Sequence, residues 1–194
     1  NGVSWVRGSA SYAGLTARAA LVSVLLTAIG LVAAQSAGAF VYWANNSVSG
    51  SPSNSIGRAN LDGTGVNQSF VSGASNPAGV AVDGARVYWA NFGSGAGNTI
   101  GRANLDGSGA NQSFITTQGG ASNPCGVAVD GTHVYWANNN GFVNTIGRAN
   151  LDGTGVDNGF ITASQPCGVA VDATHVNCGN YVGGTGTTLE RADR

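Results

Sequence analysis

Residues 79–105 read GVAVDGARVYWANFGSGAGNTIGRANL, and this stretch decides the fold because its parts recur along the chain. The motif VYWAN begins at Val41, Val87 and Val134, and IGRANLDG and GVAVD also occur three times each in the same order. A fourth and altered copy has VNCGN, starting at Val176, in place of VYWAN. A repeat of roughly 46 residues is typical of solenoids and propellers.

Each period predicts four short strands, which in the second copy are residues 79–83, 86–91, 99–105 and 112–115. Asp-Gly dipeptides stand between the first two strands and again between the last two, so we expect tight hairpins and antiparallel neighbours. The runs VAV and VYW do not alternate with polar residues, which is typical of strands buried on both faces. Radial stacking covers both faces of such sheets, so the sequence predicts an all-β propeller of four-stranded blades.

The repeats delimit about three to three and a half blades, near residues 40–75, 76–122, 123–164 and 165–194. The aromatic pair in each VYWAN motif is expected to pack between neighbouring sheets, as a structural core and not as a ligand site. These core residues are Tyr42, Trp43, Tyr88, Trp89, Tyr135 and Trp136. An arginine also recurs in the middle of each third strand, where a partly buried cation needs a paired anion or a carbonyl cap; these residues are Arg58, Arg102 and Arg148.

VYWAN followed by IGRANLDGTG and NPxGVAVD resembles the YWTD repeat, also called the low-density lipoprotein receptor class B repeat, in its bacterial secreted form. The resemblance covers about residues 40–194 and implies blades of a six-bladed propeller, with GVAVD as the innermost strand. It also implies that the repeat arginines are structural bridges and not substrate clamps. The second strand of the family ends in Thr-Asp, whereas Ala-Asn stands here, as at Ala90-Asn91. The amide still accepts a hydrogen bond, but the charged contact is lost.

The number of repeats is too small for a closed ring of six blades, which needs roughly 260 residues at this period. Either the chain is a fragment, or two half-rings associate to close one propeller. An unclosed half-ring exposes an apolar blade face at each end, and this exposure favours the fragment.

Residues 1–39 predict a secretory signal peptide. Arg7 and Arg18 precede an apolar run at 19–34, and the small residues 37–39 follow at cleavage spacing. The alternative is an uncleaved anchor, but the run has about 16 residues where a spanning helix needs roughly 20. We therefore expect a secreted, extracellular or cell-envelope protein with no membrane segment after cleavage.

The charge pattern argues against nucleic acid as a partner. Only 9% of the residues are charged, the net charge is -1, and the chain contains no Lys. Without a basic stripe there is nothing to neutralise a phosphate backbone.

No constellation of catalytic, cofactor-binding or metal-binding residues is predicted. His133 and His175 occupy the same repeat position beside a turn, and the aspartates of the LDG motifs are expected to form turns and not a calcium site. Cys167 and Cys178 are expected on one sheet face as diagonal neighbours. A disulfide between them is therefore one of the alternatives at this point. Cys125 is the repeat equivalent of Cys167.

Two functions remain open at this point. The first is a non-enzymatic extracellular module that binds a protein, a glycan or a small ligand and needs no cofactor. The second is a secreted propeller enzyme, of the lyase or lactone hydrolase type, whose catalytic residues lie outside this sequence. The absence of a catalytic constellation favours the first, although fold alone does not determine function.

Overall fold

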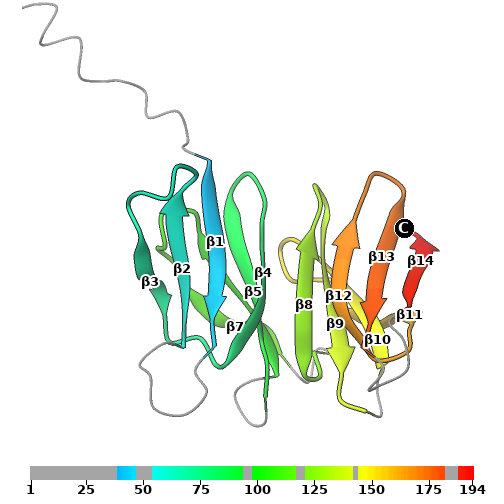
Figure 1. Cartoon of the computed structure of the whole chain (residues 1–194). Coiled ribbons are helices and arrows are strands. Elements are labelled where there is room, and N and C mark those ends of the chain that lie inside the picture. Colours follow the sequence, from blue (N-terminus) through cyan, green and yellow to red (C-terminus); the bar gives the residue numbers. More distant parts are fainter. Residues whose placement is uncertain (1–38, 47–53, 94–97, 117–120, 142–143, 182–187) are drawn as a thin grey trace, which may run out of the picture. The chain divides into compact units, whose positions relative to one another are not determined.

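The computed structural model describes residues 39–46, 54–93, 98–116, 121–141, 144–181 and 188–194, and all their regular elements are strands. The predicted signal peptide, residues 1–39, therefore lies outside the described residues except for Ala39. The fourteen strands form four separate sheets, and every pair of neighbouring strands is antiparallel and consecutive in the chain. The predicted all-β fold of antiparallel blades is confirmed (Figure 1).

The sheets follow the repeats and are named blades 1 to 4 in chain order. Blade 1 contains β1 (Phe40–Asn45), β2 (Ser55–Asn60) and β3 (Asn67–Ser72). Blade 2 contains β4 (Pro77–Val82), β5 (Arg86–Asn91), β6 (Thr99–Asn104) and β7 (Asn111–Ile115). Blade 3 contains β8 (Pro124–Val129), β9 (His133–Asn139), β10 (Asn144–Asn150) and β11 (Asp157–Thr162). Blade 4 contains β12 (Pro166–Val171), β13 (His175–Asn180) and β14 (Leu189–Asp193).

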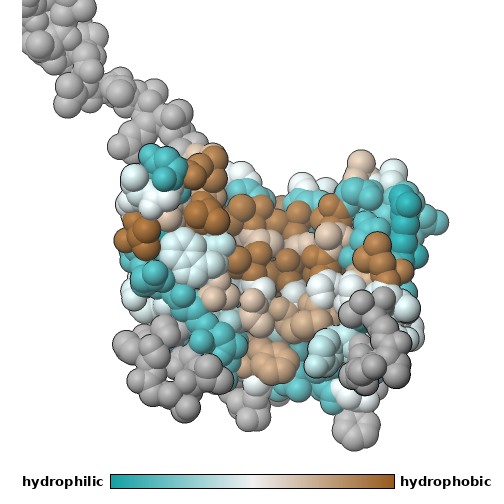
Figure 2. Space-filling view, in the orientation of Figure 1, coloured by the Kyte–Doolittle hydropathy of each residue, from teal (hydrophilic) through white to brown (hydrophobic). Residues whose placement is uncertain are grey.

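The innermost strands of blades 2, 3 and 4 are β4, β8 and β12, and they pack side by side. A Cβ on Gly79 would lie 2.8 Å from the Cys125 carbonyl oxygen, and one on Gly126 would overlap the carbonyl oxygen of Cys167. Glycine in GVAVD therefore lets each inner strand approach the next at backbone distance. Figure 2 shows a band of apolar side chains across this side of the sheets.

The turns after the innermost strands differ from the predicted two-residue Asp-Gly hairpins. Three residues connect β4 to β5, and the Asp83 carboxylate accepts hydrogen bonds from the backbone N–H groups of Ala85 and Arg86, both at 2.7 Å. Gly84 does not have a positive φ, and the same turn in blade 4 has Ala173 at its position. The aspartate forms this turn and the glycine is not required.

The connection between the last two strands is not a tight two-residue hairpin, although its length agrees with the predicted strand bounds. Six residues separate β2 from β3, with Gly63 at φ 81° and Gly65 at φ 62°. The Asp62 carboxylate accepts from the Thr64 N–H (2.9 Å) and hydroxyl (2.7 Å). These hydrogen bonds lower the pKa of Asp62 and hold the turn, and a bulge follows in the pairing of β2 with β3.

Each tryptophan of the VYWAN motif packs on a glycine of the adjacent strand. Trp89 pairs with Gly101, as Trp43 does with Gly57 and Trp136 with Gly147. A Cβ on any of these glycines would overlap the indole ring. The Trp-Gly pair is therefore one steric unit, which explains why IGRAN keeps a glycine in the middle of a strand.

Blade 4 has lost both members of this unit together. Cys178 occupies the tryptophan position and pairs with Glu190, which occupies the glycine position. Since Cys is much smaller than Trp, the side chain of Glu190 finds room where a Cβ would otherwise meet an indole ring. The altered fourth copy thus remains a sheet.

Two of the repeat arginines, Arg58 and Arg102, connect neighbouring blades. Arg102 donates from Nη1 to the Leu151 carbonyl of blade 3 at 2.8 Å, and its guanidinium lies 3.9 Å from the ring centroid of Phe114. Arg58 donates to the Leu105 carbonyl at 2.9 Å and lies between the rings of Phe40 and Phe70. The arginine stacks within its own blade and caps a carbonyl of the next.

Replacing Arg102 with alanine is expected to lower the free energy of unfolding by about 2 kcal/mol, because a stacked cation and a charge-assisted hydrogen bond are both lost. The matched control is Arg148→Ala. Arg148 stacks on Phe160 at 3.8 Å but makes no hydrogen bond to another blade among the described residues, so its loss should cost about half as much. Urea unfolding of both variants measures the difference, and equal losses would show that the bond between blades contributes nothing.

Candidate functional site

A cavity of about 420 Å³ lies at the end of the blades where the innermost strands begin and the second strands end. This is the lower end of the sheets in Figure 1. We call it the end pocket, and it is lined by Phe92, Cys125, Asn139, Gln165, Cys167 and Tyr181. Blades 2, 3 and 4 all contribute to it.

Three of these residues occupy the same repeat position, immediately after the VYWAN motif. Phe92, Asn139 and Tyr181 each donate a backbone N–H to a carbonyl of the segment before the innermost strand: to Asn76 at 3.1 Å, Asn123 at 3.3 Å and Gln165 at 2.8 Å respectively. The repeated backbone therefore places one variable side chain from each blade at the pocket.

The accepting residues have a left-handed backbone, which is uncommon for residues other than glycine. The φ angles are 44° for Asn76, 45° for Asn123 and 50° for Gln165, and each of the three precedes a proline. Asparagine tolerates this conformation better than glutamine does. Such conformations concentrate at functional sites, and one of the three residues, Gln165, lines the end pocket.

The inner wall of the end pocket carries two cysteines, and all three cysteines of the chain are free thiols. The Cys125 Sγ lies 3.1 Å from the Cys167 carbonyl oxygen and 3.4 Å from that of Pro166. Burial, with the neighbouring Cys167 thiol, raises the pKa of Cys125 well above its usual range. The neutral, buried thiol of Cys125 therefore acts as a small apolar group of the lining and not as a nucleophile.

Among the described residues, the lining contains no Asp, Glu, Lys, Arg or His. Phe92 is 38% exposed and Tyr181 is 65% exposed, so both rings present a face to solvent beside the cavity. Asn139 and Gln165 supply amide donors and acceptors. Aromatic walls with a few orienting polar groups suit an uncharged ligand.

The aromatic pairs predicted as core lie between the blades and not at the end pocket. Tyr88, Trp89, Tyr135 and Trp136 are fully buried. Tyr42 and Trp43 in blade 1 are half-buried, and no described blade covers their sheet on the far side. The residues that line the end pocket were not predicted from the sequence. The available signal was the residue after VYWAN, which is Asn46, Phe92, Asn139 or Tyr181 and so varies among otherwise similar copies.

The two histidines predicted to lie beside turns are the first residues of strands. His133 and His175 begin β9 and β13, at the other end of these strands from the end pocket. Each ring Nδ1 contacts the hydroxyl of the preceding threonine, at 2.8 and 2.6 Å. Among the described residues no group of three His, Cys, Asp or Glu side chains could hold a metal ion.

The geometry does not bring Cys167 and Cys178 together as expected. A register shift between Pro166 and Gly168 interrupts the alternation on which that expectation depended. Cys167 is exposed and lines the end pocket, whereas Cys178 is buried and lines a different cavity. The cysteine that contacts Cys167 is Cys125 of the neighbouring blade.

Comparison with solved structures places this geometry among the propellers. A chain of the nidogen/laminin complex is 25% identical, with a TM-score of 0.56, over 73% of this chain and 52% of that one. The chain has a YWTD-like β-propeller fold. Its repeat motifs thus correspond to propeller blades, as the sequence predicts.

Two enzymes share the fold at lower identity. The PQQ-bound aldose sugar dehydrogenase of Streptomyces coelicolor is 18% identical with a TM-score of 0.53, over 72% of this YWTD-like chain and 52% of the enzyme. A gluconolactonase of Xanthomonas campestris is 17% identical with a TM-score of 0.50, over 71% and 44%. The YWTD-like chain thus spans about half the length of the structures it resembles.

No protein-family model matches the sequence, and no curated protein matches it significantly. In the part of this YWTD-like chain that the structure describes, no helix has the length and apolar character needed to cross a membrane.

Proposed function

We propose that this YWTD-like chain is a secreted, non-enzymatic binding module that takes an uncharged ligand at the end pocket. The observation that carries the proposal is the lining itself, whose described residues supply two exposed aromatic rings, two amides and two thiols and no charged group. Export rests on the predicted signal peptide at residues 1–39.

A neutral glycan or a small neutral molecule of similar size fits this chemistry best. Aromatic rings such as Phe92 and Tyr181 supply broad contact area at low entropic cost. The amides of Asn139 and Gln165 can exchange hydrogen bonds with hydroxyl groups on the ligand. A strongly charged ligand would find no partner in the lining and would lose its hydration on entering.

The enzyme alternative has less support. The sugar dehydrogenase and the gluconolactonase resemble this chain in fold alone, and the described lining of the end pocket offers no carboxylate, imidazole or amine as a general acid or base. The raised pKa of Cys125 keeps that thiol protonated at neutral pH.

The test is binding of the full chain to an array of neutral glycans, followed by calorimetric titration of the strongest ligand. Two variants, Phe92→Ala and Tyr181→Ala, each remove one aromatic wall of the end pocket. Each should weaken binding at least tenfold. Leu61→Ala is the matched control, since Leu61 is also exposed (69%) but lies in a distant turn. If the variants bind as the natural chain does, the end pocket is not the site. If the natural chain converts a ligand that both variants leave intact, the module is an enzyme.

Self-association to complete a ring is part of the same proposal. Val41 of β1 and Val82 of β4 are 46% and 43% exposed, and they line an apolar hollow with Phe40, Tyr42, Val80 and Ala81. This hollow lies between β1 of blade 1 and the innermost strand of blade 2, and a second half-ring that supplies an innermost strand to blade 1 would cover it. Light scattering on the titrated samples reports whether one or two chains form the site.

A further inference from the structure

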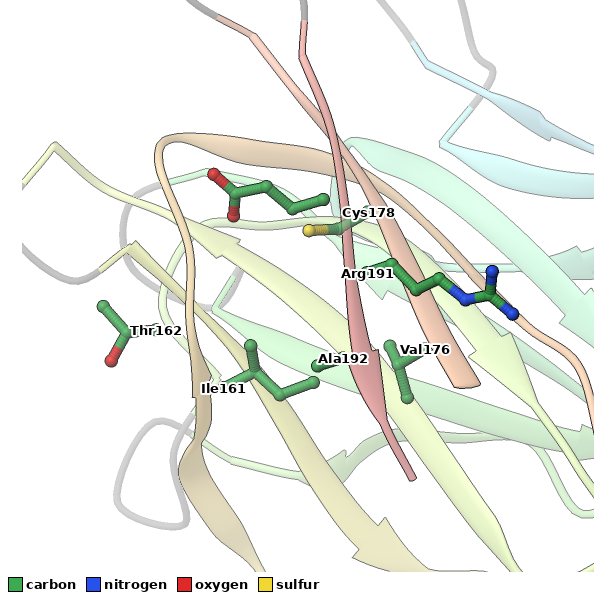
Figure 3. Close-up of a pocket in the computed structure, with 7 residues that line it drawn as sticks. Ile161, Thr162, Val176, Cys178, Arg191 and Ala192 are labelled. Carbon is green, nitrogen blue, oxygen red and sulfur yellow. The ribbon is translucent and has the colours of Figure 1, made fainter. Parts of the chain in front are cut away.

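A second cavity, of about 310 Å³, lies between blades 3 and 4 (Figure 3). We call it the interblade cavity. Strands β11, β13 and β14 line it with Ile161, Thr162, Val176, Cys178, Glu190, Arg191 and Ala192. Figure 3 shows Ile161, Val176, Cys178 and Ala192 around a common space, with β11 on one side and β13 and β14 on the other.

The repeat shows what fills this position elsewhere in the molecule. At the preceding interface, Trp136 packs with Ile115, Val134 and Ala149 in one buried cluster. By repeat position these three residues correspond to Ile161, Val176 and Ala192, which line the interblade cavity. Trp89 packs in the same way with Val71, Val87 and Ala103. The walls of the tryptophan site are thus retained between blades 3 and 4.

The tryptophan itself is absent from blade 4, because Cys178 occupies its position. Cys178 is 4% exposed, and burial is the first cause that raises the pKa of its thiol, so at neutral pH it is a small neutral group. The interblade cavity therefore corresponds to the place of a missing indole ring.

The interblade cavity also has an acidic residue where the other interfaces have a glycine. Glu190 replaces the glycine on which the indole would lie, and it brings a carboxylate to the lining. In blades 1 and 2 the indole N–H groups donate to side-chain oxygens, from Trp43 to Asn45 at 2.9 Å and from Trp89 to Gln112 at 3.0 Å. A ring that enters the interblade cavity with an N–H can donate to Glu190.

We propose that the interblade cavity is a binding site for a planar aromatic molecule of indole size that carries an N–H donor. A volume of about 310 Å³ lies at the lower end of the range for small-molecule sites. Apolar cavities left by the loss of a large side chain can take up aromatic molecules. This site is independent of the end pocket and of the function proposed for it.

Indole is the probe for the test, with the full chain titrated by calorimetry and by thermal unfolding. We expect saturable binding at one site and a rise of the unfolding temperature with indole concentration. Benzofuran has the same shape but no N–H, so it should bind at least tenfold more weakly. The Glu190→Gln variant, whose amide can still accept a hydrogen bond but has no charge, should lose part of this preference.

The decisive variant restores the pair found in the other blades, Cys178→Trp with Glu190→Gly. It should abolish indole binding and raise the unfolding temperature by several degrees, because the indole side chain then fills the cavity. Cys178→Leu, which fills less of the space, is the second variant should the first not fold, and it should weaken binding at least tenfold. No saturable binding of indole to the natural chain, or equal binding to a folded filled variant, would overturn the proposal.

Discussion

Trp89→Ala is expected to lower the free energy of unfolding by about 3–5 kcal/mol, the usual range for truncating a buried tryptophan. Trp89 is fully buried between blades 1 and 2, where it packs with Ile56, Val71 and Ala103. Its Nε1 donates to the Gln112 side chain at 3.0 Å, so truncation also leaves that acceptor without its donor. Denaturant unfolding followed by circular dichroism measures the change.

The partner of Trp89 allows a sharper test of the same unit. Gly101→Ala puts a methyl group into the space of the indole ring, so it should cost about 1–3 kcal/mol by overpacking. In the Trp89→Ala background the same substitution should cost almost nothing, because the ring that it meets is gone. The double-mutant cycle should therefore give a large coupling energy.

The control for this cycle is Gly84→Ala. Gly84 has no heavy atom within 4 Å of an added Cβ and lies in a turn without a positive φ. This substitution should change stability by less than about 0.5 kcal/mol. Additive effects of Trp89→Ala and Gly101→Ala would contradict the interpretation of the two residues as one unit.

The repeated residues allowed the fold to be predicted. Three copies of VYWAN and IGRAN define which segments pair, and apolar runs such as Val87-Tyr88-Trp89 indicate sheets covered on both faces. The strand bounds in blade 2 agree with the prediction to within two residues. Because the same residue pattern occurs in three copies, a deviation in one copy does not hide the common strand order. The architecture could therefore be predicted well.

The errors concern local backbone geometry, which residue patterns describe poorly. Asp83-Gly84 suggested a tight hairpin, but the aspartate side chain forms a three-residue turn there. The bulge after Pro166 removed the relation expected between Cys167 and Cys178. A single extra residue reverses the facing of all that follow, and no residue type marks such a bulge in advance.

The two cavities arise where the copies differ and not where they agree. Phe92 and Tyr181 occupy a position that varies from blade to blade, and Cys178 with Glu190 replaces a pair that three blades keep. Residues that are the same in all copies lie in the blades and their turns, because each blade has the same packing problem. The binding features could not be predicted in this way, since they depend on how neighbouring blades meet.

Asn91→Asp is the second substitution for which we expect a large loss, about 3–5 kcal/mol of unfolding free energy at pH 7. Asn91 is fully buried, and its Nδ2 donates to the Thr99 hydroxyl at 2.8 Å and to the Gln112 carbonyl at 3.0 Å. Its Oδ1 accepts from the Ser75 N–H at 2.9 Å. A carboxylate keeps the accepted bond but cannot donate, and it faces a carbonyl oxygen without a counter-ion.

The loss of unfolding free energy in Asn91→Asp should depend on pH, and burial of the carboxyl group decides whether it grows or shrinks as the pH falls. Desolvation raises the pKa of the introduced carboxyl above its unfolded value of about 3.9. The neutral acid is the form that the folded state tolerates, so the deficit against the natural chain is largest above the folded pKa and shrinks as the pH falls through it. About 1 kcal/mol should remain at low pH, because one O–H donor replaces two N–H donors. Unfolding at a series of pH values measures this dependence.

The matched control is Asn45→Asp in blade 1. Asn45 makes the corresponding bonds, to the Ser55 hydroxyl at 3.1 Å and the Gln68 carbonyl at 2.7 Å, but it is only half-buried. Solvent should reduce its loss to about 1 kcal/mol with little change across pH. YWTD repeats have an aspartate at the position of Asn45 and Asn91. The two Asn→Asp substitutions therefore test whether the stability of this chain depends on the amide as a hydrogen-bond donor. Equal and pH-independent losses at the two sites would contradict the prediction that burial of the charged carboxylate causes most of the loss at Asn91.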